Sequence, residues 1–367
     1  MFRKIFLFVL LIATVFTVSG CSQDERETVF LLGRQQLKNI YAIDKGEREY
    51  LTLTSYVFET AGEGQLIYSP GKYGGYRYGP SIIRNEDGSL DVWFASPGKS
   101  GEWDYIRYRH SDDGISWDEE EIVLKPTSGA SDHYSVCDPG VVYFNGYYYL
   151  GYTSTTHSDG TENEVYVARS KNPEGPYQKW NGKGWGKDPV PIITYTDEEG
   201  YWGCGEISFV VKDDALYCYY SWICQDGTFT RLSIADLSDD WPLTLKDQGN
   251  VIHKGAAEDS CDVIYVEDLG LFFAFDVSLR FTENSKVNYY SSSDGIAFDY
   301  EGSIDYGLHS CAHNLGISKG KDGHDSSGDE LILGYAYAER ESSDSWGNWY
   351  TQFQPIKLSV KEETLKY

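Results

Sequence analysis

Short runs of β-branched and aromatic residues, each opening on a small or ionisable residue, recur five times along this 367-residue chain. The openings are Tyr78-Gly79-Pro80-Ser81-Ile82-Ile83, Cys137-Asp138-Pro139-Gly140-Val141-Val142, Gly205-Glu206-Ile207-Ser208-Phe209-Val210, Cys261-Asp262-Val263-Ile264-Tyr265 and Ala312-His313-Asn314-Leu315-Gly316-Ile317. From Gly79 the steps to Asp138, Glu206, Asp262 and His313 are 59, 68, 56 and 51 residues. A spacing that recurs at this length indicates one structural unit repeated in tandem.

Each opening run is followed by two more apolar runs, with turn residues between them. The second runs span residues 90–95, 147–153, 216–221, 271–276 and 331–337, and the third span 105–111, 165–170, 230–235, 287–292 and 350–356. Asn145-Gly146 separates the first two runs of the second unit, and Asn-Gly between apolar runs is a strong hairpin signal. Helical periodicity is nowhere sustained. The pattern predicts an all-β fold, a five-bladed β-propeller with at least three strands in each blade.

Two of the units carry a matching turn after their third run, at residues 110–117 and 291–298. Each turn reads Ser-x-Asp-Gly and ends on an aromatic residue, Trp117 or Phe298. The turns resemble the Asp box found between outer strands of sialidase-type propellers, where a carboxylate or hydroxyl caps its own loop. We therefore interpret them as structural and not catalytic.

The N-terminus has the pattern of a targeting segment. Arg3 and Lys4 precede an apolar run, and Val18-Ser19-Gly20 leads into Cys21. This resembles a bacterial lipobox, so we expect residues 1–20 to be a signal peptide and Cys21 to be lipidated, with an ordinary secretory signal as the alternative. The protein would then be anchored by lipid to a bacterial membrane, at the cell surface or in the periplasm. Residues 21–65 are mixed and charged and are predicted to be a tether and lead-in, and residues 66–367 to be the propeller domain.

The charge balance excludes one class of partner. Removal of residues 1–20 takes away two basic and no acidic residues, so the formal charge moves from −26 to −28. A surface this negative repels polyanions, which argues against nucleic acid, and it suits neutral ligands better than acidic ones.

Six cysteines remain after Cys21, at positions 137, 204, 218, 224, 261 and 311. They do not form the dense framework of a disulfide scaffold, and the close Cys-x-x-Cys pairs of structural zinc sites are missing. We interpret them as small buried thiols, with four of them near the propeller axis, and keep one disulfide as the alternative.

The ionisable residues of the openings converge if the fold is a propeller. Innermost strands line the central channel, so Asp138, Glu206, Asp262 and His313 are expected to form a ring at one mouth. Glycoside cleavage needs one carboxyl that holds a proton and one that is ionised. Crowded carboxylates separate their pKa values, because ionising one makes ionising its neighbour more costly. The ring is therefore a candidate site for hydrolysis of glycans.

The blade pattern at residues 137–150, together with Ala168-Arg169-Ser170 and Gly175-Pro176-Tyr177, resembles the family 43 glycoside hydrolases over roughly residues 75 to 360. The resemblance implies a five-bladed propeller that cleaves arabinosides, xylosides or related plant or microbial glycans, mostly with inversion. It also implies a general-base Asp from blade one, an orienting Asp from blade two, matched by Asp138, and a general-acid Glu from blade three, matched by Glu206. His313 matches a channel histidine that lies beside calcium or water in relatives, and no cofactor is required.

The chain departs from this family pattern in blade one, where Gly79 stands in place of the base. Three outcomes stay open. Asp138 or Asp262 serves as base with Glu206 as acid, or a loop carboxylate such as Asp132 fills the gap. In the third outcome the protein is a lipoprotein of an uptake system that binds oligosaccharides without cutting them. A sialidase-like enzyme fits less well, because those enzymes have six blades and an arginine cluster, and this chain has 12 Arg.

Aromatic residues near the openings are candidates for stacking on sugar rings. They precede the first three blades and are Tyr73, Tyr76, Tyr78, Tyr134 and Trp202. The sequence thus predicts a surface-anchored glycoside hydrolase-like protein, with an incomplete family catalytic set and an oligosaccharide or polysaccharide as its ligand.

Overall fold

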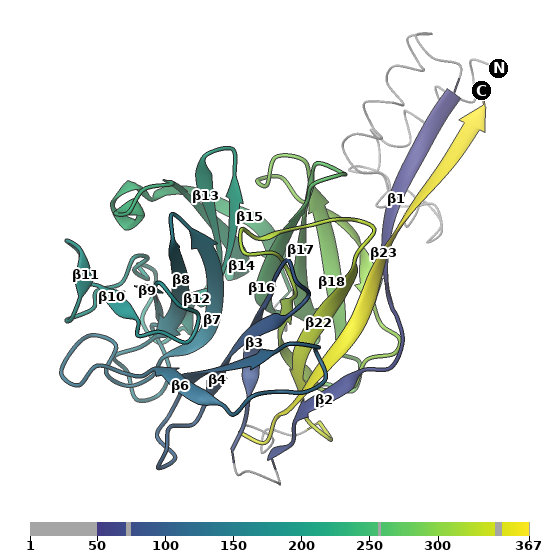
Figure 1. The fold of residues 1–367 in the computed structure, drawn as a ribbon. Coiled ribbons are helices and arrows are strands. Elements are labelled where there is room, and N and C mark those ends of the chain that lie inside the picture. The colour runs from purple at the N-terminus through teal and green to yellow at the C-terminus, as the bar shows by residue number, and fades with distance from the viewer. Residues whose placement is uncertain (1–49, 71–74, 256–257, 342–346, 367) are drawn as a thin grey trace.

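Five β-sheets stand around one central channel in the computed structural model, which describes residues 50–70, 75–255, 258–341 and 347–366 (Figure 1). Nearly all regular structure in these residues is strand, and the 3₁₀ helix η1 (Trp241–Thr244) is only four residues long. The predicted all-β, five-bladed propeller is confirmed. No helix in the described ranges is long and apolar enough to cross a membrane.

The blades are numbered in chain order, and each begins with an inner strand beside the channel. Blade one contains β3 (Tyr78–Arg84), β4 (Leu90–Ser96), β5 (Tyr105–Ser111) and β6 (Glu121–Leu124). Blade two contains β7 (Cys137–Phe144), β8 (Tyr147–Ser154), β9 (Glu164–Ser170), β10 (Gln178–Trp180) and β11 (Trp185–Gly186). Blade three contains β12 (Gly203–Lys212), β13 (Ala215–Cys224), β14 (Gly227–Asp236) and β15 (Lys246–Lys254).

The last two blades contain strand pairings between segments that are far apart in the sequence. Blade four contains β16 (Asp259–Val266), β17 (Leu271–Ser278), β18 (Lys286–Ser292) and β19 (Asp299–Ile304), with β21 (His324–Asp325) parallel to β16 at its inner edge. Blade five contains β20 (Ala312–Ile317), β22 (Glu330–Tyr337) and β23 (Tyr350–Lys366), with β1 (Tyr50–Thr60) and β2 (Gln65–Tyr68) both paired to β23.

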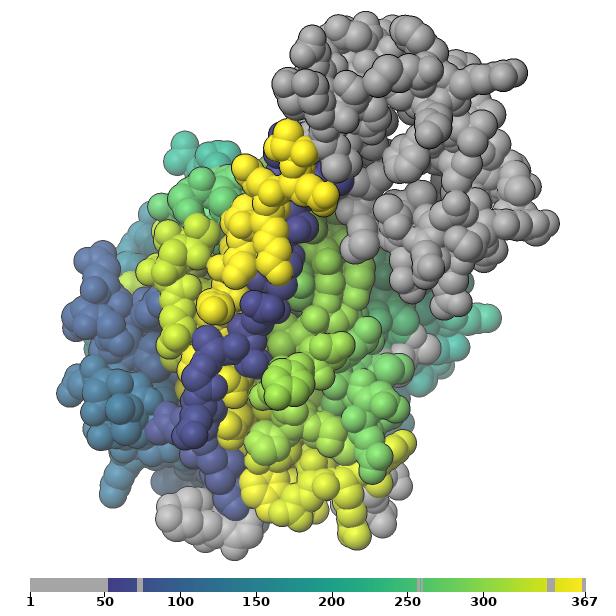
Figure 2. Space-filling model, turned by 90° about the vertical axis from the view of Figure 1, so that its right-hand side faces the viewer, coloured from purple at the N-terminus to yellow at the C-terminus, as the bar shows by residue number. Residues whose placement is uncertain are grey.

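The N-terminal strand closes the ring, which corrects the predicted boundary of the propeller at residue 66. All eleven residues of β1 pair with β23, from Tyr50 opposite Lys366 to Thr60 opposite Ile356. Figure 2 shows this strand in purple beside the yellow C-terminal strand on the outer surface. The predicted lead-in is therefore part of blade five from Tyr50 onward, and the predicted signal peptide and Cys21 lie outside the described residues.

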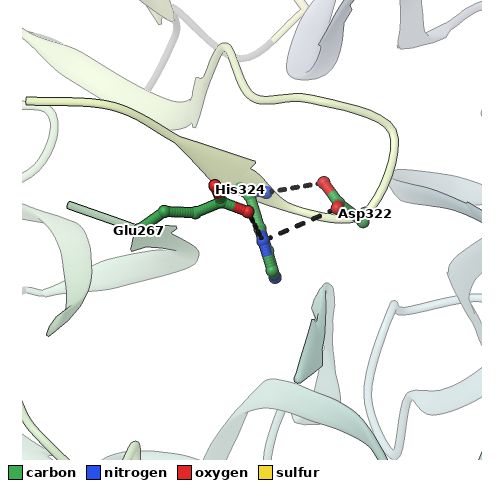
Figure 3. A group of neighbouring side chains, drawn as sticks. All are labelled: Glu267, Asp322 and His324. Atoms are coloured by element: carbon green, nitrogen blue, oxygen red, sulfur yellow. Dashed lines mark hydrogen bonds and ion pairs between the residues drawn. The ribbon is translucent and has the colours of Figure 1, made fainter. Parts of the chain in front are cut away.

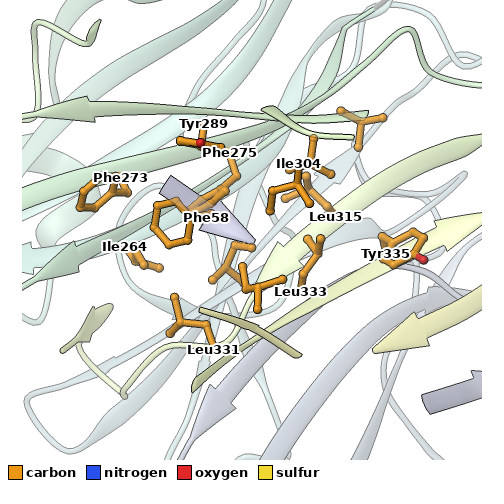
Figure 4. Packing of buried hydrophobic residues seen from close by; sticks show 14 of the residues in the cluster. Phe58, Ile264, Phe273, Phe275, Tyr289, Ile304, Leu315, Leu331, Leu333 and Tyr335 are labelled. Atoms are coloured by element: carbon orange, nitrogen blue, oxygen red, sulfur yellow. The ribbon is translucent and has the colours of Figure 1, made fainter. Parts of the chain in front are cut away.

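Phe58 shows that β1 belongs to the core. Its buried ring packs edge-on against Phe273, Phe275 and Tyr289 of blade four, at centroid distances of 5.2, 4.9 and 5.1 Å (Figure 4). Burial of a phenylalanine side chain contributes about 1.5–3 kcal/mol. The N-terminal strand thus joins blades four and five as well as extending one sheet.

One end of the channel is closed by residues 318–325, which we call the crossing segment. Its backbone oxygens accept hydrogen bonds from inner-strand N–H groups of four blades: Arg84 to Lys319 at 2.8 Å, Tyr143 to Lys321 at 2.6 Å, Val211 to Asp322 at 2.8 Å and Tyr265 to Gly323 at 3.0 Å. These donors lie near the C-terminal ends of β3, β7, β12 and β16. The open mouth is therefore at the N-terminal ends of the same strands.

The two Asp-box turns have the predicted structural role. Asp113 accepts hydrogen bonds from the N–H groups of Ile115 and Ser116 at 2.8 and 2.6 Å, and Asp294 accepts them from Ile296 and Ala297 at 2.9 and 2.8 Å. Each carboxylate caps the turn between the third and fourth strands of its blade.

The six cysteines of the described chain are free and buried, as the thiol interpretation predicts. They are divided among three core clusters. Cys204, Cys218 and Cys224 belong to one core cluster, Cys261 to another, and Cys137 and Cys311 to a third.

Candidate active site

Every inner strand carries a β-bulge near the open mouth of the channel. The register shifts lie between Tyr78 and Ser81, Cys137 and Gly140, Gly205 and Ser208, Asp259 and Asp262, and Ala312 and Leu315. The residue after the shift begins has positive φ in four blades, namely Gly79 (53°), Asp138 (45°), Glu206 (55°) and Ser260 (63°). A bulge re-aims a side chain out of the regular ladder, so these positions form the rim of one pocket.

Ser260, and not Asp262, occupies the equivalent position in blade four. Asp262 lies two residues further along β16, where its Oδ1 accepts a hydrogen bond from Ser208 Oγ at 2.6 Å and forms an ion pair with the Lys319 ammonium. Its Oδ2 accepts one from Ile317 N at 2.7 Å. The expected common phase of the four ionisable residues is thus wrong for blade four.

The pocket brings together Asp138, Glu206, Ser260 and Asn314 around Gly79, and the predicted Asp262 also lines it. Both carboxylate oxygens of Glu206 accept hydrogen bonds, Oε1 from Asn314 Nδ2 at 2.8 Å and Oε2 from Ser260 N at 3.0 Å. Hydrogen bonds from N–H groups favour the charged form of a carboxylate. Ser260 and Asn314 were missed as site residues, and both stand beside a residue that the sequence pattern did select.

Asp138 has the opposite environment. It is buried, and its Oδ1 has no hydrogen-bond partner among the described residues. Burial raises the pKa of Asp138 well above its usual range, and the charges of Glu206 and Asp104 raise it further. The two carboxyl groups therefore have different surroundings: N–H donors contact Glu206, whereas burial favours the protonated form of Asp138.

Arg280 is the cation of this site, and the sequence pattern gave no sign of it. It lies between two residues of positive φ, Leu279 (51°) and Phe281 (66°). Burial lowers the pKa of Arg280, and the charges of Glu206 and Asp138 oppose that shift. An arginine remains protonated under such conditions, so its positive charge balances the pocket.

Gly79 is held close to Asp138. Its φ of 53° is a conformation that L side chains rarely adopt. A Cβ at this position would lie 3.3 Å from Asp138 Oδ1 and 3.5 Å from its Cα. At its bulge, blade one therefore places backbone atoms close to Asp138 and supplies no carboxylate.

Asp104 is a third carboxyl group near Asp138 that sequence reasoning missed. It is buried just before β5 and accepts hydrogen bonds from the hydroxyls of Tyr76 and, at 2.8 Å, Tyr78. Burial raises the pKa of Asp104 to about 6, although both tyrosine hydrogen bonds oppose the shift. Asp104 does not line the pocket, so it acts on Asp138 through its charge.

His313 lies behind the pocket in an aromatic cage. The rings of Tyr78, Phe281 and Trp349 surround it at centroid distances of 5.6, 4.8 and 4.9 Å. Burial lowers the pKa of His313 well below its usual range, and Arg280 lowers it further. Calcium requires six to eight oxygen ligands, and this cage supplies aromatic carbon instead. The described surroundings of His313 do not fit a calcium ion, nor do they place its ring in the pocket, where Asn314 stands.

Asp132 does not fill the gap in blade one. It is fully buried, forms an ion pair with Lys179, and accepts hydrogen bonds from Thr127 N and the Tyr152 hydroxyl, both at 3.1 Å. These contacts hold a loop between blades one and two, away from the pocket.

The aromatic candidates occupy different places. Tyr76 and Tyr78 are buried, and their hydroxyls donate hydrogen bonds to Asp104. Tyr134 is exposed, and its ring contacts His133. Trp202 packs over Gly205, so that a Cβ on that glycine would lie 2.7 Å from the indole ring. Trp202 therefore contacts the residue that precedes Glu206 in β12, and Tyr73 lies outside the described residues.

Solved structures with a similar fold come from several glycoside hydrolase families. A family 117 glycoside hydrolase from Zobellia galactanivorans is 16% identical, with 83% of this chain and 90% of that chain covered and a TM-score of 0.57. An α-L-arabinofuranosidase from Podospora anserina is 12% identical, with coverage of 83% and 97% and a TM-score of 0.56. An endo-1,4-β-xylanase from Bacteroides thetaiotaomicron is 14% identical, with coverage of 82% and 98% and a TM-score of 0.52. At these identities the likeness shows the fold alone.

No curated protein matches the chain. The family model described as "Glycosyl hydrolases family 43" matches residues 75–268, which is more than half of the chain and includes Gly79, Asp138, Glu206 and Ser260. Family and fold together support a glycosidase, and the chain belongs to glycosyl hydrolase family 43.

Proposed function

We propose that this protein hydrolyses glycosidic bonds in arabinoside- or xyloside-type glycans, with Asp138 and Glu206 as its acid–base pair. One observation carries the proposal: two buried carboxyl groups meet at the channel mouth, where N–H donors hold one of them and the other has a raised pKa. Glycoside hydrolysis needs one carboxyl group that donates a proton and one that acts as a base.

The family resemblance assigns the proton donor to Glu206, and the contacts of the pocket favour the reverse. Burial raises the pKa of Asp138, which favours its protonated form, so in this proposal Asp138 donates its proton to the leaving glycosidic oxygen as the carbon–oxygen bond breaks. Glu206, whose carboxylate oxygens accept hydrogen bonds from Asn314 and Ser260, takes a proton from the water whose oxygen bonds to the sugar carbon. Protons balance, because the pair ends with Asp138 ionised and Glu206 protonated.

The substrate class is supported by charge, stacking surface and structural neighbours. A formal charge of −26 suits a neutral sugar. Trp202 offers an indole face beside Glu206. Two of the solved structures with this fold are, by name, an arabinofuranosidase and a xylanase.

The test is hydrolysis of a panel of aryl arabinofuranosides, aryl xylosides and polysaccharides by the wild type, Asp138→Asn and Glu206→Gln. We expect each variant to lose about 10²–10⁴-fold in kcat, as is usual for a general acid or base. Full activity in both variants would refute the proposal. The close control is Glu119→Gln, which changes an exposed carboxylate outside the pocket.

Glycan capture without cleavage is a second candidate, which Gly79 favours because it removes the family base. Calorimetry separates the two functions. A capture protein binds a glycan that is recovered unaltered, whereas a hydrolase yields new reducing ends.

We also propose that Cys21 carries the lipid anchor and that residues 21–49 tether the propeller to a bacterial membrane, at the cell surface or in the periplasm. The support is the sequence of residues 3–21. Metabolic labelling with a fatty acid should mark the wild type and not Cys21→Ala. An unlabelled wild type would show that the segment is an ordinary secretory signal.

A further inference from the structure

A second group of ionisable side chains lies at the closed end of the channel. Glu267 follows β16 of blade four, and Asp322 and His324 belong to the crossing segment (Figure 3). His324 Nδ1 lies 2.7 Å from Glu267 Oε1 and 3.5 Å from Asp322 Oδ2, and the three ligand atoms lie within 4.8 Å of one another. Seven residues separate Glu267 from Ser260, roughly 23 Å along an extended strand, so this group is remote from the pocket.

The two nitrogens of the imidazole face different acceptors: Nε2 faces a backbone carbonyl, and Nδ1 faces the two carboxylates, where a cation can take the place of a proton. Nε2 lies 2.5 Å from the carbonyl oxygen of Val211, a distance at which the nitrogen must carry the proton. In the neutral ring the lone pair then belongs to Nδ1, the nitrogen that faces both carboxylates. Histidines that bind metals typically donate their other N–H to a carbonyl or carboxylate in this way.

The charge balance of the group calls for a cation. Two carboxylates share one imidazole, and in the described part of the chain no lysine or arginine forms an ion pair with either of them. The basic residues nearby are engaged elsewhere: Arg84 pairs with Asp325, Lys212 pairs with Asp213, and Lys321 lies over the Tyr143 ring. A neutral imidazole with two carboxylates carries a charge of −2, which a divalent cation neutralises.

The backbone beneath the group is already fixed. Gly323 lies between Asp322 and His324 with a φ of 88°, and a Cβ there would lie 2.7 Å from Phe209 O. His324 N donates to Asp322 Oδ1 at 3.1 Å, and Gly320 N donates to His324 O at 2.7 Å. The carboxylates themselves are open to solvent, since the side chains of Glu267 and Asp322 are 65% and 49% exposed. A cation could therefore enter and keep water in its remaining positions.

We propose that Glu267, Asp322 and His324 bind a divalent cation of the zinc class, through Oε1, Oδ2 and Nδ1. One imidazole, two carboxylates and open positions for water suit first-row transition metals, whereas calcium and magnesium prefer oxygen ligands alone. The cation would join blade four to the crossing segment, which also bonds to the inner strands of blades one, two and three. Its role is structural, and it does not depend on the proposed hydrolase activity.

The experiment is zinc titration by calorimetry of tag-free, EDTA-treated protein, with the thermal midpoint measured at each zinc concentration. We expect one zinc per chain and a midpoint that rises until the site is full, because a ligand that binds only the folded state stabilises it. Glu267→Gln and His324→Gln should each weaken zinc binding by roughly 10- to 100-fold or more. Glu267→Gln is the safer variant for folding, since its side chain is mostly exposed.

Two matched controls separate this site from other zinc binding. Glu86→Gln changes an exposed carboxylate that lines the same surface pocket as Glu267, Asp322 and His324. His309→Gln changes a histidine that stacks on Tyr337 in blade five. Both should bind zinc as the wild type does. Three results would overturn the proposal: no zinc binding by the wild type, equal binding by Glu267→Gln and His324→Gln (an adventitious ion only), or tighter binding of calcium than of zinc.

Discussion

Asn314 Nδ2 donates a hydrogen bond to Glu206 Oε1 at 2.8 Å, and this bond joins the inner strands of blades five and three across the channel mouth. The amide of Asn314 stands where the sequence pattern placed the imidazole of His313, because the bulge in β20 turns His313 into its aromatic cage. Blade five thus supplies a neutral donor to the carboxylate. The donor contributes to catalysis only if Glu206 acts in its charged form.

Replacement of Asn314 by leucine should therefore impair catalysis more than folding. A hydrogen bond to a charged group is worth about 1.5–3 kcal/mol, which corresponds to a loss of roughly 10- to 100-fold in kcat/KM. The measurement is kcat/KM on an aryl glycoside together with the thermal midpoint. Asn314→Asp, which replaces the donor with a second negative charge, should be at least as inactive. Wild-type kcat/KM in Asn314→Leu would show that this donor has no part in the reaction.

Leaving-group dependence should identify the proton donor. If Asp138 donates the proton, Asp138→Asn loses about 10²–10⁴-fold on substrates with a poor leaving group and far less on a dinitrophenyl glycoside, whose leaving oxygen needs no proton. Glu206→Gln should lose activity equally on both and recover part of it with azide, which replaces the water that the base activates. The wild-type ratio between the two substrates is the reference.

The reverse result is equally informative. Retention of dinitrophenyl activity by Glu206→Gln, with azide rescue of Asp138→Asn, would assign the acid to Glu206, as the family resemblance does. The hydrogen bonds from Asn314 and Ser260 would then hold Glu206 only until substrate displaces them.

Asp104 should set the basic limb of the pH profile. Its charge is among the causes that raise the pKa of Asp138, so Asp104→Asn should lower that pKa. Activity that requires protonated Asp138 is lost as pH rises through its pKa, and the basic limb of kcat/KM should move to lower pH. Asparagine can still accept a hydrogen bond from the hydroxyl of Tyr76 or Tyr78, which protects the fold. If the basic limb of kcat/KM does not move in Asp104→Asn, Asp104 has no influence on the titration that controls the reaction.

The parts of the fold that the sequence predicted are those whose side chains alternate between two buried faces. The predicted run at residues 105–111 coincides with β5 (Tyr105–Ser111), and the run at 90–95 with all but the last residue of β4. The fourth strands escaped prediction because they lie at blade edges, where few positions are buried, as in β15 (Lys246–Lys254). β1 escaped because its pairing partner, β23, is about 300 residues away and no turn links the two.

The site was predictable only where a bulge residue is itself ionisable. Asp138 and Glu206 satisfy that condition, and the structure places both at the pocket. Asp262 also lines the pocket, but it stands two residues beyond the bulge, where Ser260 has the positive φ. Asp104 and Arg280 lie on loops whose positions depend on how neighbouring blades pack, and a single sequence contains no periodic signal for them.

Replacement of Gly79 by aspartate, the residue that the family pattern has in blade one, should destabilise the protein and should not increase kcat. Gly79→Ala places a Cβ 3.3 Å from Asp138 Oδ1 in a left-handed backbone conformation, which costs about 1–2 kcal/mol in the free energy of unfolding. Gly79→Asp adds a further charge beside Asp138 and should be less stable than the alanine variant, with no gain in kcat. Urea denaturation and kcat on the aryl substrates test both points. A rise in kcat for Gly79→Asp would mean that the pocket can accept the family's blade-one base.

Lys319 and Asp262 should behave as a buried ion pair that holds the closed end of the channel. The Lys319 ammonium contacts Asp262, Ser208 Oγ at 3.0 Å and the Val263 carbonyl at 3.1 Å, and both side chains of the pair are at most 10% exposed. Removal of one partner leaves an uncompensated buried charge, at a cost of about 3–5 kcal/mol, so Lys319→Met and Asp262→Asn should each lower the free energy of unfolding by that amount. The double variant removes both charges and should lose clearly less than the sum of the two single losses, which a double-mutant cycle by urea denaturation measures. Additive losses would show that the two charges are not coupled. In that case the carboxylate of Asp262 would be available for a role other than binding the crossing segment.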